Sequence, residues 1–207
     1  MKGFGDLYKT EKKKNKKNKF SKEQIINIAI DFHSTGNIAE AARYYQQIIK
    51  EGCDDQRVFS NYGVILESLG KSEEAEKLFR KAIELNPNFA AAYSNLGIIL
   101  KDLDKLEEAE IAYRKAIELD PYFAEAYHNL GIILKDLDKL EEAEISYQKA
   151  IKINPNYADA HYNLGIVLKE LDKLGEAKIA YQKAIEVNPD YADAHYNLGN
   201  ILKDLDK

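Results

Sequence analysis

The sequence has 207 residues, of which 45% are hydrophobic, and it carries a net charge of −5 at pH 7. Its mean hydropathy is −0.50, and no apolar run approaches the roughly 18 residues of a membrane span, so we expect a soluble protein without a membrane helix. The single cysteine, Cys53, excludes an internal disulfide framework. No apolar segment follows the N-terminal lysines to form a secretory signal, and the cytoplasm is the simplest location.

Residues 1–21 form a lysine-rich leader. Residues 1–22 contain nine lysines against Asp6 and Glu11, so they carry +7 and leave −12 on the rest of the chain. One dominant sign of charge and few apolar residues predict a disordered tail. Such a tail could touch nucleic acid, anionic lipid or an acidic partner. We favour a solubilising leader without a specific target.

From residue 22 onwards the chain repeats with a period of 34 residues. The period is shared by Pro87, Pro121, Pro155 and Pro189, and by Gly63, Gly97, Gly131, Gly165 and Gly199. A period of about 20–50 residues is typical of solenoids. We divide the chain into a divergent capping unit at 22–55, four units at 56–89, 90–123, 124–157 and 158–191, and a half unit at 192–207.

Each unit contains two helix patterns. In residues 90–123, apolar side chains recur at helical spacing from Tyr93 to Leu103 and again from Leu106 to Ile117. The intervening residues 102–105 suffice only for a tight turn, so we expect two antiparallel helices. The proline near the end of each unit should stop the second helix, because proline cannot continue it.

Two kinds of small or turn-forming residue support this unit. The turn holds Gly36 or Gly70 in the first two units and Asp104, Asp138 or Asp172 afterwards. Both residue types accept the left-handed conformation that ends a helix, aspartate at a modest energetic cost. Gly97 and Ala109 should let the two helices approach closely, with Tyr93 and Tyr113 filling the space around them.

These positions resemble the tetratricopeptide repeat (TPR) family. The family pattern of an aromatic, Leu-Gly, a large residue, Ala, an aromatic, Ala and Pro maps onto Tyr93, Leu96, Gly97, Leu100, Ala109, Tyr113, Ala116 and Pro121. The match is strong over residues 56–207 and looser over 22–55, where Cys53 stands at the proline place. The resemblance implies an all-α fold, a right-handed α-solenoid whose first helices line a concave groove.

An asparagine occupies the sixth place of each unit. The set is Asn61, Asn95, Asn129, Asn163 and Asn197. An amide donates and accepts hydrogen bonds, so it can pair with a peptide bond whatever the peptide's side chains are. Helices about 8–10 Å apart and an extended chain rising about 3.3 Å per residue would match one asparagine to roughly every third peptide unit. The stretch also resembles the TPR segment of O-linked N-acetylglucosamine transferase, where such a ladder grips the substrate main chain. Alternatively, the amides are solvated or bond within the repeat.

Other first-helix places complete the predicted peptide site. The fifth place holds His128, Tyr162 and Tyr196, and the twelfth holds Lys101, Lys135 and Lys169. A carboxylate clamp, the other TPR mode, needs basic residues at the second place. Glu125 and Asp159 stand there instead, which argues against a strongly acidic ligand.

The residues indicate no enzyme. His161 and His195 lie one repeat apart, too far for shared metal ligation, and we predict no catalytic site, cofactor or metal. A basic groove with interleaved aromatics is also missing, so no specific nucleic acid is expected.

We therefore predict a scaffold that binds a protein or peptide partner. The alternative is the substrate-recruiting arm of a longer bacterial glycosyl-, sulfo- or methyltransferase, with the catalytic domain beyond residue 207; the downstream coding sequence discriminates between them. We expect a monomer, or weak self-association through an uncapped C-terminal end.

Overall fold

The computed structural model describes residues 20–205 of the chain. The predicted disordered tail therefore lies, apart from Phe20 and Ser21, outside the described residues. Within 20–205 there are eleven helices and no strand: α2 (Lys22–Ser34), α3 (Ile38–Lys50), α4 (Gln56–Ser68), α5 (Ser72–Leu85), α6 (Ala90–Asp102), α7 (Leu106–Leu119), α8 (Ala124–Asp136), α9 (Leu140–Ile153), α10 (Ala158–Glu170), α11 (Leu174–Val187) and α12 (Ala192–Leu205). The all-α prediction is confirmed.

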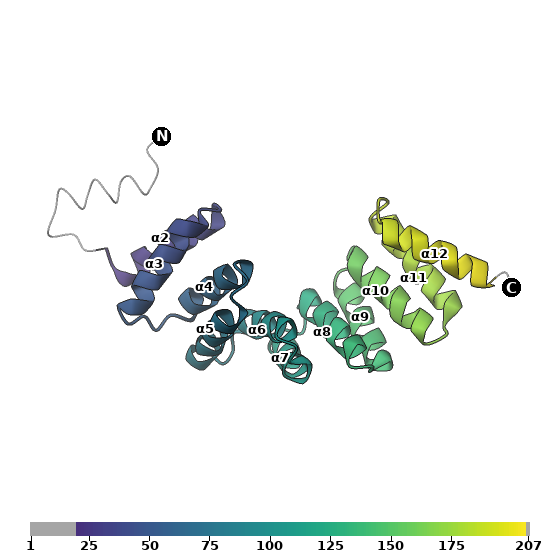
Figure 1. Ribbon diagram of the computed structural model, residues 1–207, viewed down its shortest axis with the longest axis horizontal. Helices are drawn as coiled ribbons and strands as arrows, with labels where there is room; N and C mark the ends of the chain where they lie inside the picture. The colour runs from purple at the N-terminus through teal and green to yellow at the C-terminus, as the bar shows by residue number, and fades with distance from the viewer. Residues whose placement is uncertain (1–19, 206–207) are drawn as a thin grey trace.

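The helices form a curved row of pairs (Figure 1). The even-numbered helices are here called first helices. Those from α2 to α10 each pack most extensively against the following odd-numbered second helix, and α12 packs on α11. Every second helix packs in turn on the next first helix. In addition, α4 contacts α6, α6 contacts α8, and α8 contacts α10, so successive first helices lie along the inner side of the row. The predicted α-solenoid of helix pairs is confirmed.

The turns inside the pairs use the residues that the sequence indicated. Gly36 and Gly70 have φ values of 77° and 70°, and Asp104, Asp138 and Asp172 have values of 58°, 59° and 58°. With the chain in this left-handed conformation, the Lys105 N–H reaches back to the Leu100 carbonyl at 2.8 Å, a helix-ending bond that satisfies an otherwise unpaired carbonyl. The prolines also act as predicted, because α7 ends at Leu119, two residues before Pro121.

Within each pair a glycine of the first helix faces an aromatic ring of the second. A Cβ atom added at Gly97 would lie 2.7 Å from the Tyr113 ring, and one added at Gly131 would lie 2.7 Å from the Tyr147 ring. Both rings are almost fully buried. The glycine thus allows the close approach that the sequence predicted, and the tyrosine fills the space that the missing side chain leaves.

Successive second helices are joined by ion pairs on the other side of the solenoid. In α5, Arg80 binds Glu76 of its own helix at 2.8 Å and Glu108 of α7 at 2.7 Å. Arg114 of α7 repeats this arrangement with Glu110 and with Glu142 of α9. We call Arg80 and Arg114, with their bound glutamates, the arginine straps. A lysine pair runs beside each strap, between Lys105 and Glu76 and between Lys139 and Glu110. A third lysine pair joins Lys173 to Glu144.

Candidate functional site

The repeated asparagines all lie on first helices, where each is partly exposed. Asn61 is on α4, Asn95 on α6, Asn129 on α8, Asn163 on α10 and Asn197 on α12. Because successive first helices contact one another, the five amides follow the inner side of the solenoid. Their surroundings change along the chain.

Each asparagine from Asn95 onwards belongs to a set of three positions, which we call a rung. A rung comprises the asparagine, the fifth-place residue of the preceding first helix and the last residue of the preceding unit. Two rungs contain serine and phenylalanine: Ser60, Phe89 and Asn95, then Ser94, Phe123 and Asn129. We call these the serine rungs. The next two contain aromatic rings: His128, Tyr157 and Asn163, then Tyr162, Tyr191 and Asn197. We call these the aromatic rungs.

In the first aromatic rung both ring nitrogens of His128 are engaged. The Tyr157 hydroxyl lies 3.2 Å from His128 Nδ1, and Asn163 Nδ2 lies 3.0 Å from His128 Nε2. The tyrosine and histidine rings also contact each other in a tilted arrangement, with centroids 4.7 Å apart and planes at 37°. An amide N–H aimed at Nε2 needs an acceptor there, so the neutral ring carries its proton on Nδ1 and donates it to Tyr157.

Burial keeps this histidine neutral. His128 is 7% exposed, and desolvation lowers the pKa of its imidazole, opposed by the nearby Asn129 amide and the carboxylates of Asp159 and Glu125. Lys101 adds a smaller lowering effect on the same pKa. His128 was predicted to line the groove, but the structure places it beneath Tyr157 and Asn163. Its chemical role is to orient those two side chains.

The second aromatic rung repeats this design with tyrosine. Asn197 Nδ2 donates to the Tyr162 hydroxyl at 3.1 Å, and the Tyr162 and Tyr191 rings lie 4.9 Å apart. The Tyr191 hydroxyl donates to Asp159 at 2.8 Å. Tyr196, by contrast, is 72% exposed at the fifth place of α12.

The serine rung at Asn129 has a different setting. Burial raises the pKa of the Tyr113 phenol, and the nearby Asn129 amide acts in the opposite direction. The equivalent phenol in the next unit, Tyr147, has a buried hydroxyl without a hydrogen-bond partner among residues 20–205. Its equivalent asparagine, Asn163, is turned to His128 instead.

Charged residues border the rungs. Lys101 and Lys169 are exposed, and Lys135 is partly covered beside Asp136, with Nζ 3.4 Å from the carboxylate. Lysine alternates with aspartate or glutamate along the groove, so neither positive nor negative charge predominates there. Sequence reasoning missed Tyr157 and Tyr191 as groove residues. The sequence feature that could have identified them is a change from Phe89 and Phe123 to tyrosine. It occurs in the same units in which the fifth-place serine changes to His128 and Tyr162.

Across the described part of the chain, no group of three or more His, Cys, Asp or Glu residues is placed to hold a metal ion. His161 and His195 each donate from Nε2 to a proline carbonyl, at 2.9 and 2.8 Å. Nor is any helix among residues 20–205 both long and apolar enough to cross a membrane.

Several solved structures share this architecture. A crystal structure of MamA aligns with a TM-score of 0.72 at 25% identity, covering 80% of this chain and 97% of that one. YrrB, described as a TPR protein with an unusual peptide-binding site, gives a TM-score of 0.74 at 22% identity, with 94% and 97% coverage. PilF of Pseudomonas aeruginosa gives 0.77 at 18% identity, with 89% and 86% coverage. No curated protein sequence matches significantly.

Family profiles agree with these structures. The profile described as "TPR repeat" matches residues 133–172 and 167–206, and "Tetratricopeptide repeat" matches 112–145. The middle TPR-like domain of cilia and flagella-associated protein 70 matches residues 26–128. Together these matches extend from residue 26 to residue 206, over every helix pair described above. The chain is therefore a member of the tetratricopeptide repeat family.

Proposed function

We propose that this chain is a protein–protein interaction scaffold that holds an extended partner segment along its first helices, by the partner's main chain. The observation that carries the proposal is the line of five partly exposed amides on successive first helices. A repeated amide suits a repeated peptide bond, because it offers both a donor and an acceptor. The likeness to YrrB, whose description names a peptide-binding site, supports this use of the fold.

The two kinds of rung should contribute differently. Asn163 and Asn197 each use one amide hydrogen for His128 or Tyr162. Each amide keeps its oxygen and a second hydrogen for a ligand, and its rotation is already restricted. Fixed side chains lose less entropy on binding. We therefore assign the aromatic rungs to orientation of the peptide and the serine rungs to adaptable contact.

Three further properties belong to the proposal. The mixed charges around Lys101, Lys135 and Lys169 favour a ligand that is not strongly acidic. The chain acts as a scaffold in the cytoplasm, where a reducing environment suits the free, buried Cys53, and has no catalysis of its own.

The test begins with a peptide selected from a random library on the intact protein. The selected peptide is titrated against wild type and against Asn95→Ala/Asn129→Ala. Each lost pairing should cost about 0.5–1.5 kcal/mol, so we expect the affinity to fall by about one to two decades. Asn156→Ala is the matched control, because Asn156 is an exposed asparagine in the turn after α9.

A second titration separates main-chain from side-chain recognition. Peptides N-methylated at single positions should lose affinity at about every third residue, while alanine replacement of the same residues should matter less. Unchanged affinity of the double variant, with an intact fold by circular dichroism, would rule out the amide ladder as the peptide grip.

A further inference from the structure

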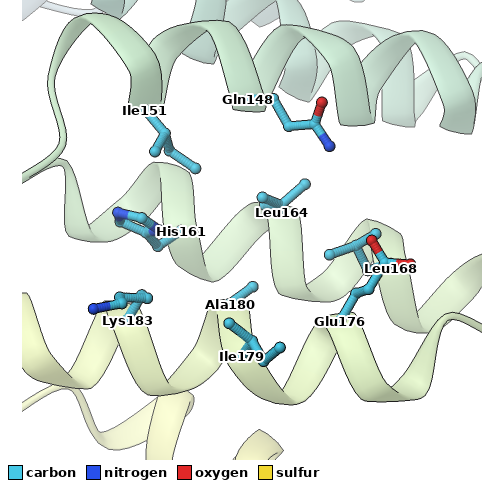
Figure 2. Close-up of a pocket in the computed structure, with 9 residues that line it drawn as sticks. All are labelled: Gln148, Ile151, His161, Leu164, Leu168, Glu176, Ile179, Ala180 and Lys183. Atoms are coloured by element: carbon cyan, nitrogen blue, oxygen red, sulfur yellow. The ribbon is translucent and has the colours of Figure 1, made fainter.

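A pocket opens between second helices at one place in the solenoid. It lies between α9 and α11, has a volume of about 340 Å³, and has α10 as its floor (Figure 2). Leu164 and Leu168 of α10 form the apolar floor, with His161 beside them. Gln148 lines the α9 side, and Glu176, Ala180 and Lys183 line the α11 side. Its size falls at the lower end of the range for ligand pockets, about 300–1,000 Å³.

The repeat shows why the pocket is here. Gln148 occupies the sequence place that Arg80 and Arg114 occupy in the two preceding units. At those places an arginine crosses from one second helix to a glutamate of the next. Gln148 instead bonds Glu144 of its own helix at 3.1 Å. The arginine strap between α9 and α11 is absent, although the neighbouring lysine pair, Lys173 with Glu144, is kept at 2.7 Å.

The glutamate that would receive this strap is also kept. Glu176 is the equivalent of Glu108 and Glu142, and it has no ion pair within residues 20–205. The pocket therefore combines an apolar floor with a carboxylate without an ion pair at one end. The Lys183 ammonium at the other end is already paired with Glu186 at 2.6 Å. The same protein fills the two equivalent places with an arginine side chain whose guanidinium bridges two carboxylates.

We propose that this pocket receives an arginine side chain from a partner polypeptide. The aliphatic stem would lie over Leu164 and Leu168, and the guanidinium would bind Glu176. Arginine is favoured over lysine because its planar fork binds carboxylates bidentately and is more weakly hydrated than an ammonium group. This site lies on the second-helix side of the solenoid, so it is separate from the asparagine groove and does not rest on the proposed function.

The probe is the pentapeptide acetyl-Gly-Ala-Arg-Ala-Gly-amide, titrated at millimolar concentrations into the intact, ¹⁵N-labelled protein. We expect amide shifts in α9, α10 and α11 that saturate. Replacing arginine by citrulline keeps the shape but removes the charge, and should weaken binding by about tenfold or more, as expected for loss of a charge-assisted hydrogen bond. Lysine in the same position should bind more weakly than arginine.

Three variants sharpen the test. Gln148→Arg should rebuild the strap to Glu176 and abolish the shifts in α9–α11 without lowering the melting temperature. Glu176→Gln should weaken binding as much as citrulline does. Arg114→Gln should free Glu142 and create a second binding site between α7 and α9. Shifts that are absent from α9–α11, equal for citrulline, or unaffected by Gln148→Arg would overturn the proposal.

Discussion

The rungs at Asn129 and Asn163 have the same backbone setting but different neighbours. Asn129 follows Ser94 and Phe123, and its amide lies near the Tyr113 phenol of the preceding second helix, whose pKa it lowers against the larger effect of burial. Asn163 follows His128 and Tyr157, and its amide bonds the histidine on the preceding first helix. The later rung thereby ties two first helices together and leaves the Tyr147 hydroxyl unpaired. Changing two neighbours of an asparagine therefore gives it a hydrogen-bond partner on the preceding first helix without changing the fold.

Both units share a contact between a first-helix glycine and a second-helix tyrosine, and substitution of the glycine tests it. Gly97→Leu and Gly131→Leu should each destabilise the protein by about 1–3 kcal/mol, because the new side chain overpacks a buried tyrosine ring. The two losses should be similar, since a Cβ at either glycine would lie 2.7 Å from its ring. Thermal or urea unfolding measures both. A clearly larger loss at one site would show that the units differ in their cores as well as in their rungs.

Substitution of Tyr113 and Tyr147 tests how the two units differ. Tyr113→Phe removes a phenol that has the polar Asn129 amide as a neighbour and should cost about 0.5–1.5 kcal/mol. Tyr147→Phe removes a buried hydroxyl without a partner, so it should be neutral or stabilising by up to about 1 kcal/mol. Phe79, at the equivalent place in α5, shows that the site accepts this ring. Equal losses in the free energy of unfolding for the two variants, measured with urea, would contradict this difference between the two phenols.

The turns distinguish early from late units by a smaller amount. Asp138→Gly should stabilise the protein by less than about 1 kcal/mol, because glycine accepts the φ of 59° without the strain of a side chain but loses more entropy on folding. Gly70→Ala, the matched reverse change, should be destabilising. Differential scanning calorimetry on both variants checks the signs, and stabilisation by Gly70→Ala would contradict this account.

The smallest expected effect is the pH dependence of the first aromatic rung, which involves one titrating ring. Because burial holds the pKa of folded His128 below its ordinary value of 6.5, the unfolded chain binds more protons between these two pKa values. Stability should therefore rise with pH through this window and fall as the pH drops below about 6.5. His128→Ser, which copies the serine rung, should flatten that slope in urea unfolding. A slope identical to that of wild type would contradict the buried neutral ring.

Local sequence predicted the helices and turns well. Helix-period apolar patterns, prolines and left-handed turn residues such as Asp104 act within a few residues of where they stand. The close contact of Gly97 with Tyr113 was also predictable, since both positions recur in every unit. These features depend on neighbours that the repeat itself fixes.

The hydrogen bonds of the rungs were harder to predict from the sequence. Asn163 and His128 are 35 residues apart, and their contact depends on how closely α8 and α10 approach, which no single unit encodes. In the sequence, the pocket's position appeared only as a departure from the repeat, because Gln148 stands where the two preceding units have arginine. Its place had no assigned role until the structure showed Arg80 and Arg114 bridging neighbouring helices.

The arginine straps and lysine pairs have a mechanical consequence. Direct contacts between first helices form the inner side of the curve, and ion pairs between second helices connect the outer side. A change in the curvature of the solenoid must therefore lengthen or shorten the distances between the paired side chains on the outer side. Because α9 and α11 retain only the lysine pair, the solenoid should be more compliant at that junction than at the two junctions that carry arginine straps, and its stiffness there should decrease as salt screens the charges.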